Sequence, residues 1–301
     1  MYAGPYFFSE NTENGYKLQT NEFFKLKEKI NCVENIQFIL IKSDKDAKKF
    51  FDGTVDVTCN TALDLNKFSY FSQLPNFSTG EDILVMLLSP GDKHHELSSD
   101  ITSLISLAID RNTISKNYHN QLSCFSSFLD FYYDKTSEGI INHPKNIQEC
   151  INLDISYENY YPNYEILTQI AKQLSKYNIN VTLHEDAYGH WTSHCHLRFE
   201  IRRLPHGSSI QIIRSELSKI RQSNKYHDCI KKIYSALFDK NYLRKHQFIF
   251  EKIDHFLRLN TTYIPLFRLP VGFLYNDKLR HETLFSIGNY ITYRNNNENK
   301  T

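Results

Sequence analysis

Residues 149–185 read ECINLDISYENYYPNYEILTQIAKQLSKYNINVTLHE, and this stretch carries the clearest structural pattern in the chain. Apolar residues alternate with polar ones from Ile151 to Ile155, which is typical of a strand. Between Tyr164 and Tyr177 they recur three and four residues apart, so they share one helix face. The alternation returns from Ile179 to Leu183. The order strand, helix, strand predicts a βαβ unit with two parallel strands.

The first 60 residues carry strand patterns of a different kind. Strand-like runs at 6–9 and 16–20 flank Asn14-Gly15, a dipeptide that favours a hairpin turn because both residues tolerate positive φ. The continuous apolar run at 36–42 predicts a buried strand, and the alternation at 55–59 predicts a half-buried one.

Further along, strands and helices follow one another. Residues 83–88, 195–201 and 263–270 have the patterns of strands or buried extended segments, and a helical pattern leads into Ala108-Ile109-Asp110-Arg111. Three more helical patterns cover 209–221, 227–239 and 242–258. This alternation predicts an α/β protein whose helices pack on a mainly parallel sheet.

Composition narrows the possible functions. The chain has 301 residues, of which 41% are hydrophobic, and a formal net charge of +1, which argues against a nucleic-acid scaffold held by bulk electrostatics. None of the six cysteines forms a C-x-x-C pair, which favours free, buried thiols in a reducing compartment. The N-terminus has no export signal, and no stretch is long enough to span a membrane, so the sequence predicts a cytoplasmic protein.

Histidines gather near position 190, but they match no known metal signature. His194 and His196 are expected on one face of a strand, where they would bind one zinc or nickel ion with His190 or Glu185 as the third ligand. A metal-dependent enzyme therefore stays open as an alternative. Phosphate loops, nucleophile elbows and H-E-x-x-H motifs are absent from the sequence, so we expect no catalytic residue, resident metal or cofactor.

Five segments in chain order carry a family resemblance. They are Gly4-Pro5-Tyr6 with Asn21-Glu22-Phe23-Phe24, then Asp52-Gly53-Thr54-Val55-Asp56-Val57, Ser106-Leu107-Ala108-Ile109-Asp110-Arg111, the unit at 149–185, and Ile264-Pro265-Leu266. Together these segments resemble the family 5 solute-binding proteins of ABC transporters. The resemblance implies a non-catalytic, two-lobed fold of the periplasmic-binding-protein type (type II). One lobe is expected from 1–80 and 265–301, and the other from 85–262.

The family's domain has a long stretch before its G-P-Y motif, so the resemblance also implies that the first lobe is incomplete in this chain. The Leu204-Pro205 corner and residues 286–293 look like the solute-binding half of SgrR-type transcription regulators. That resemblance implies a cytoplasmic ligand sensor that reaches DNA only through an N-terminal domain outside this chain. The alternative is an ABC transporter binding protein, extracytoplasmic if its true start lies upstream.

The resemblance places the ligand at the loop that follows the strand at 195–201. Peptide binders of the family carry an acidic residue in this loop, which holds the peptide's amino group. Arg202, Arg203 and His206 stand here instead, and guanidinium groups suit carboxylates and phosphates. We therefore expect an anion such as a sugar phosphate or a carboxylate, or a peptide. Arg203 is the preferred anchor, and Trp191 and Tyr188 are candidate aromatic walls.

Overall fold

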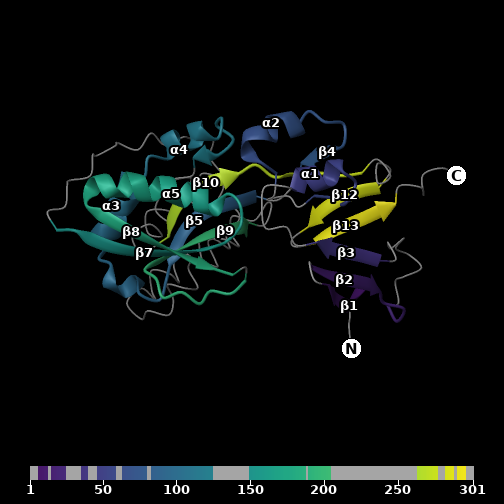
Figure 1. Ribbon diagram of the computed structural model, residues 1–301, viewed down its shortest axis with the longest axis horizontal. Coiled ribbons are helices and arrows are strands. Elements are labelled where there is room, and N and C mark those ends of the chain that lie inside the picture. The colour runs from purple at the N-terminus through teal and green to yellow at the C-terminus, as the bar shows by residue number, and fades with distance from the viewer. Residues whose placement is uncertain are drawn as a thin grey trace, which may run out of the picture. The chain divides into compact units, whose positions relative to one another are not determined.

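The computed structural model describes residues 6–12, 15–24, 35–39, 46–58, 63–79, 83–124, 149–187, 189–204, 263–276, 282–287 and 290–295 (Figure 1). The chain divides into two compact units. The first combines residues 1–82 with 271–301, and the second consists of residues 83–270. The three helical patterns predicted at 209–258 lie outside the described residues.

The second unit is built on a six-stranded sheet with the order β6-β10-β5-β9-β7-β8. The strands are β5 (Ile83–Pro90), β6 (Ser123–Cys124), β7 (Ile151–Glu158), β8 (Ile179–Asp186), β9 (Leu197–Leu204) and β10 (Ile264–Leu269). Only β7 runs parallel to its neighbours, β8 and β9, whereas the pairs β9–β5, β5–β10 and β10–β6 are antiparallel. The prediction of a mainly parallel sheet was therefore wrong, because strands from distant parts of the sequence complete the sheet.

The predicted βαβ unit is confirmed. Between parallel β7 and β8 lies α5 (Asn163–Leu174), whose buried residues are Asn163, Ile166, Leu167, Ile170 and Leu174. A 3-10 turn, η4 (Ser175–Tyr177), follows this helix and ends at Asn178, which has a φ of 60° and so turns the chain into β8. The ring of Tyr157 in β7 lies 5.9 Å from that of Tyr164 in α5, which identifies the face of β7 that the helix covers.

Two more α-helices of this unit lie among the residues that the structure describes. α3 (Ser99–Ala108) contacts α5 and β10, so α3 and α5 lie on the same side of the sheet (Figure 1). Ser98 caps α3 by accepting a hydrogen bond from the Ile101 amide, and Asp110 caps α4 (Arg111–Asn117) through the Thr113 amide. A 3-10 turn, η3 (His94–Glu96), connects β5 to α3.

The core of the second unit lies under these helices and along the central strands. Val85, Met86, Leu87 and Leu88 of β5 are fully buried, and so are Leu266 and Phe267 of β10. The continuous apolar runs at 83–88 and 264–267 therefore belong to strands buried on both faces, as the sequence predicted.

The two ends of this sheet are distinguished by which strands begin and which strands finish there. Ile83 is paired with Leu204, and Leu84 with Leu269, so β5 begins where β9 and β10 end. The chain enters and leaves the unit at this end of the sheet. At the opposite end, which we call the far end, β5 finishes and β9 begins.

The first unit contains a three-stranded antiparallel sheet, β1-β2-β3, formed by β1 (Tyr6–Thr12), β2 (Gly15–Thr20) and β3 (Asn35–Ile39). The hairpin is confirmed, and a Cβ on Gly15 would meet the Phe38 carbonyl oxygen. The strand β3 is not buried, since Phe38 is 40% exposed. Its ring stacks on Tyr16 at 4.7 Å, and Phe8 lies beyond Tyr16 at 6.4 Å.

The other described elements of this unit are short. They are α1 (Asp46–Phe51), the 3-10 turn η2 (Leu65–Lys67), α2 (Phe68–Phe71), β4 (Phe77–Thr79) paired with β11 (Gly272–Leu274), and β12 (Glu282–Ile287) paired with β13 (Tyr290–Asn295). Leu63, Phe68, Phe71 and Leu274 form a small core. The strand predicted at 55–59 is reduced to a single bridge between Val57 and Tyr275 among the described residues.

The boundary between the units differs from the predicted one. We expected the segment from residue 265 onward in the first lobe, but β10 pairs with β5 from Ile264 to Leu269, and the second unit extends to Pro270. The buried strand therefore belongs to the larger sheet. Among the described residues, no helix has the length and apolar character needed to cross a membrane.

Candidate functional site

Strand β9 presents a row of charged side chains on the face turned away from α5. Phe199 is paired with Tyr157, whose ring contacts the helix, so odd-numbered residues of β9 face α5. Arg198, Glu200 and Arg202 therefore share the opposite face. All three are half-buried, so their charges are partly removed from water.

Arg198 is the unmatched charge in this row. Its guanidinium carbon lies 5.6 Å from the centre of the Trp191 ring, a cation–π contact. Its Nε is buried without a hydrogen-bond partner, and the guanidinium forms no hydrogen bond or ion pair with any of the described residues. A half-buried guanidinium that forms no ion pair with the described residues is unusual, because desolvated charges are normally paired.

Arg202 differs from Arg198 because its charge is matched. Its Nη2 donates a hydrogen bond of 3.0 Å to Oε2 of Glu200, and its guanidinium lies over the Tyr263 ring at 4.8 Å. The other oxygen of Glu200 accepts a short hydrogen bond from the hydroxyl of Ser89 in β5. The row thus runs from Trp191 and Arg198, through Glu200, to Arg202 and Tyr263.

The position of Trp191 is fixed by carboxylates at both sides of its loop. Asp186 ends β8 and is 2% exposed; its Oδ1 accepts hydrogen bonds from the amides and hydroxyls of Thr192 and Ser193. Burial opposes ionisation of Asp186, but these hydrogen bonds outweigh it and lower its pKa. Glu158, at the end of β7, accepts from the Gly189 amide. The loop that carries Trp191 is therefore held at its base.

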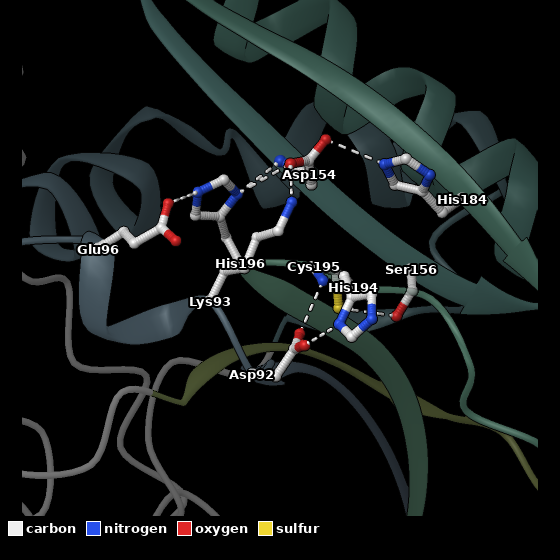
Figure 2. A network of polar contacts seen from close by, with 9 residues as sticks. All are labelled: Asp92, Lys93, Glu96, Asp154, Ser156, His184, His194, Cys195 and His196. Carbon is white, nitrogen blue, oxygen red and sulfur yellow. Dashed lines mark hydrogen bonds and ion pairs between the residues drawn. The ribbon is translucent and has the colours of Figure 1, made fainter.

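At the far end of the sheet, the segment before β9 enters a network of polar contacts (Figure 2). Asp154 of β7 is its centre: Oδ1 lies 3.0 Å from Nε2 of His184, and Oδ2 lies 3.4 Å from Nζ of Lys93. The hydrogen bond from His184 lowers the pKa of Asp154 despite partial desolvation. Asp154 is therefore ionised at neutral pH.

A second carboxylate, Asp92, holds the adjoining residues (Figure 2). Its Oδ2 makes a short contact with Nδ1 of His194, and its Oδ1 accepts a 2.8 Å hydrogen bond from the Cys195 amide. The hydrogen bond with His194 is the larger cause and the one from the Cys195 amide the next, and together they hold the pKa of Asp92 far below its usual range. Cys195 is fully buried, and its sulfur lies 3.1 Å from the hydroxyl of Ser156.

His196 occupies the junction between this network and β9. Its Nδ1 accepts a 3.0 Å hydrogen bond from the Asp154 amide, so the proton of the neutral ring belongs on Nε2. Nε2 lies 3.4 Å from Oε2 of Glu96, an acceptor. The geometry thus selects one neutral tautomer of a side chain that is 8% exposed.

The residues predicted from the sequence are brought together only in part. Trp191 and Arg202 both take part in the row on β9, but Arg202 is paired with Glu200. The side chain of Arg203, and Tyr188 and His206 as a whole, lie outside the described residues. Sequence reasoning missed Arg198 as a candidate, although the alternation along 195–201 already placed it on the polar face of the strand.

The alternative metal site is not supported. His194 and His196 precede β9, and their rings contact different carboxylates, Asp92 in one case and Glu96 and Asp154 in the other (Figure 2). No group of three or more histidine, cysteine or acidic side chains among the described residues is arranged to hold a metal ion. The shared strand face expected for these histidines was wrong because the strand begins only at Leu197.

Comparison by sequence gives no relative: no family model matches the chain, and no curated protein does. Comparison by structure gives many. OppA from Haemophilus influenzae, in complex with the peptide RPPGFSPFR, superposes with a TM-score of 0.75 at 13% identity over 94% of this chain. NikA from Staphylococcus aureus, in complex with Ni(L-His)2, gives 0.71 at 12% over 97%. DppA from Helicobacter pylori, an ABC transporter-associated periplasmic binding protein in complex with the peptide STSA, gives 0.67 at 14% over 95%.

These likenesses establish the fold. The chain has the mixed α/β architecture of periplasmic binding proteins, as the sequence predicted. It spans 61%, 69% and 60% of the lengths of the three structures.

Proposed function

We propose that this chain is a non-catalytic solute-binding protein, and that its ligand is an anion held by Arg198 beside Trp191. The observation that carries the proposal is the half-buried guanidinium of Arg198, which forms no ion pair and no hydrogen bond with the described residues. The fold supports a binding role, because OppA and DppA are solved with peptides and NikA with a nickel complex.

The chemistry of the guanidinium favours an anion. A partly desolvated charge is costly unless an opposite charge accompanies it, and a ligand carboxylate or phosphate would supply both the charge and hydrogen-bond acceptors. Trp191 adds a flat apolar wall on one side of the guanidinium. Arg202 is a weaker candidate because Glu200 already neutralises it. Arg203, His206 and Tyr188 stay in the proposal as further contacts.

Two roles follow from such a site, and we favour transport. The sequence first suggested the ligand-sensing half of an SgrR-type regulator, but the structural neighbours named above support the alternative. DppA is described as associated with an ABC transporter and as periplasmic. A binding protein of that class acts outside the cytoplasm, so an extracytoplasmic location belongs to this proposal.

The test is a thermal-shift screen with inorganic phosphate, sulfate, glucose 6-phosphate, acetate and short peptides. It compares the wild type with Arg198→Gln, which removes the charge but keeps a hydrogen-bonding side chain. Arg268→Gln is the matched control, since Arg268 is an exposed arginine of the same sheet. An anion present at about 100 times its Kd should stabilise the wild type by about 2.7 kcal/mol.

We expect a stabilising anion to lose its effect in Arg198→Gln and to keep it in Arg268→Gln. Equal stabilisation of all three proteins would contradict the assignment of Arg198. Failure of every anion in the screen to stabilise the wild type would contradict the anionic ligand.

A further inference from the structure

We propose that His196 makes the anion site respond to pH, because the bond that ends the β7–β9 ladder needs the neutral ring. The inference rests on the proposed function for its consequence, ligand release, but the structural step stands without a ligand. A proton added to Nδ1 removes the acceptor of the Asp154 amide. Uptake of this proton should loosen the start of β9 and weaken the hold of Arg198 on an anion.

The backbone geometry shows why the ring matters. The amide of His196 donates to the Asp154 carbonyl at 3.0 Å, and the Asp154 amide donates to Nδ1 of His196 at 3.0 Å. The parallel ladder continues from there with Ile155 opposite Leu197. The imidazole thus stands where the ladder would otherwise use a backbone carbonyl as acceptor. Unlike a carbonyl, an imidazole nitrogen can take up a proton.

Charged and titratable groups face His196 from three other segments. The turn after β5 supplies Lys93, His94 and Glu96. Strand β7 supplies Asp154, and His184 of β8 contacts Asp154. Burial, and then the neighbouring His196, lower the pKa of His94, which is therefore neutral near pH 7. Asp154 stays ionised over the same range because its pKa is lowered.

These neighbours offer a protonated ring somewhere else to bind. Oδ2 of Asp154 lies 3.5 Å from Nδ1, and Oε2 of Glu96 lies 3.4 Å from Nε2. A charged imidazole would turn Nδ1 toward the carboxylate and leave the Asp154 amide without its acceptor. Proton uptake thus exchanges a ladder bond for an ion pair.

The change reaches the anion site through a short and firmly held segment. His196 is two residues from Arg198. The four residues before His196 are held by two carboxylates: Asp186 binds Thr192 and Ser193, and Asp92 binds His194 and Cys195. Since both carboxylates have lowered pKa values, these ties persist at mildly acidic pH. Movement at His196 is therefore not absorbed toward the loop but is passed along β9 to Arg198, whose contact with Trp191 it changes.

The structural step is tested on the ligand-free chain by nuclear magnetic resonance. The amide of Asp154 is followed from about pH 8 to about pH 5 in the wild type, His196→Asn and His190→Asn. Asparagine keeps an oxygen acceptor near the position of Nδ1 but does not titrate. His190 is an exposed histidine of the same loop, so His190→Asn is the matched control.

We expect the Asp154 amide to lose its hydrogen-bonded shift at low pH in the wild type and in His190→Asn, and to keep it in His196→Asn. An Asp154 amide whose shift does not change with pH in the wild type overturns the inference, and this result does not depend on whether the variant folds. An amide that moves equally in His196→Asn also overturns it.

The consequence is tested by the affinity for sulfate, which has no proton to gain in this range. We expect about a tenfold loss from pH 8 to pH 5.5 in the wild type, equivalent to one hydrogen bond, and a constant affinity in His196→Asn. A wild-type affinity that holds or rises at low pH contradicts the coupling. If sulfate does not bind at any pH while the Asp154 amide behaves as expected, the proposed function has failed and the proton-sensitive bond has not.

Discussion

Arg111, the first residue of α4, fastens the corner between α3 and α4 to strand β10 through the carbonyl oxygen of Pro265. Its Nε and Nη2 donate to this oxygen at 2.9 and 2.6 Å, and Nη1 donates to the carbonyl of Ser106 at 3.0 Å. One guanidinium thus joins segments 154 residues apart in the sequence. The last residue of the Ala108-Ile109-Asp110-Arg111 segment thus has a structural role.

Arg111→Lys should destabilise the chain, because an ammonium cannot make the same fork of hydrogen bonds. We expect the free energy of unfolding to fall by about 2 kcal/mol, the scale of hydrogen bonds to a charged group. Chemical denaturation measures the change, and Arg268→Lys, at an exposed position, is the control. A loss that is the same in both variants would argue against the clamp.

Gly91 lies where the turn after β5 meets Cys195, and its backbone leaves no room for a side chain. An added Cβ would lie 2.2 Å from the Cys195 carbonyl oxygen and 2.7 Å from its sulfur. Gly91→Ala should therefore cost about 3 kcal/mol or more through displaced backbone. Gly189→Ala is the comparison: its φ of 75° disfavours alanine, but the added atom meets nothing, so the loss should be about 1 kcal/mol. Equal losses in thermal or urea denaturation would show that the contact at Gly91 relaxes.

Asp92 should make stability depend on pH on the acid side. Because its folded pKa is lowered, it contributes stability above the ordinary aspartate value of about 4, and this contribution is lost as pH falls below that value. Asp92→Asn should be less stable than the wild type at neutral pH, and the difference should shrink as pH falls. Urea denaturation from neutral pH downward checks this, with Glu149→Gln, an exposed acid, as the control. A gap that stays constant with pH would contradict the role of the ionised form.

Local patterns predicted the local parts of the fold. The βαβ unit around α5 and the hairpin β1–β2 are held by contacts between segments close in sequence, so periodicity and turn residues were sufficient. The mixed sheet was missed because β5 pairs with β9 on one side and with β10 on the other, both far away in the sequence, and a sequence pattern does not encode the partner or direction of a strand. β3 reads as a buried strand, yet it lies exposed because apolar character does not reveal whether a covering layer exists.

The candidate site, too, could be predicted only where it depends on local sequence. Trp191 was singled out because it is the lone tryptophan of the chain, and the alternation along β9 was visible in the sequence. The sequence did not show which arginine forms no ion pair. The pairing of Arg202 depends on Glu200, and also on Ser89 and Tyr263, which come from distant parts of the sequence. The histidine pattern misled because the start of β9 is set by its pairing with β7 and β5 and not by its composition.

The central claim, that Arg198 beside Trp191 holds an anion, is tested most directly by the fluorescence of Trp191, the only tryptophan in the chain. Emission is followed while sulfate or glucose 6-phosphate is added to the wild type and to Arg198→Gln, with sodium chloride at matched ionic strength as the reference. A saturable change in the wild type that needs at least about tenfold more anion in Arg198→Gln, or about 1.4 kcal/mol, is the predicted result. Saturation at the same concentration in both proteins would contradict the account.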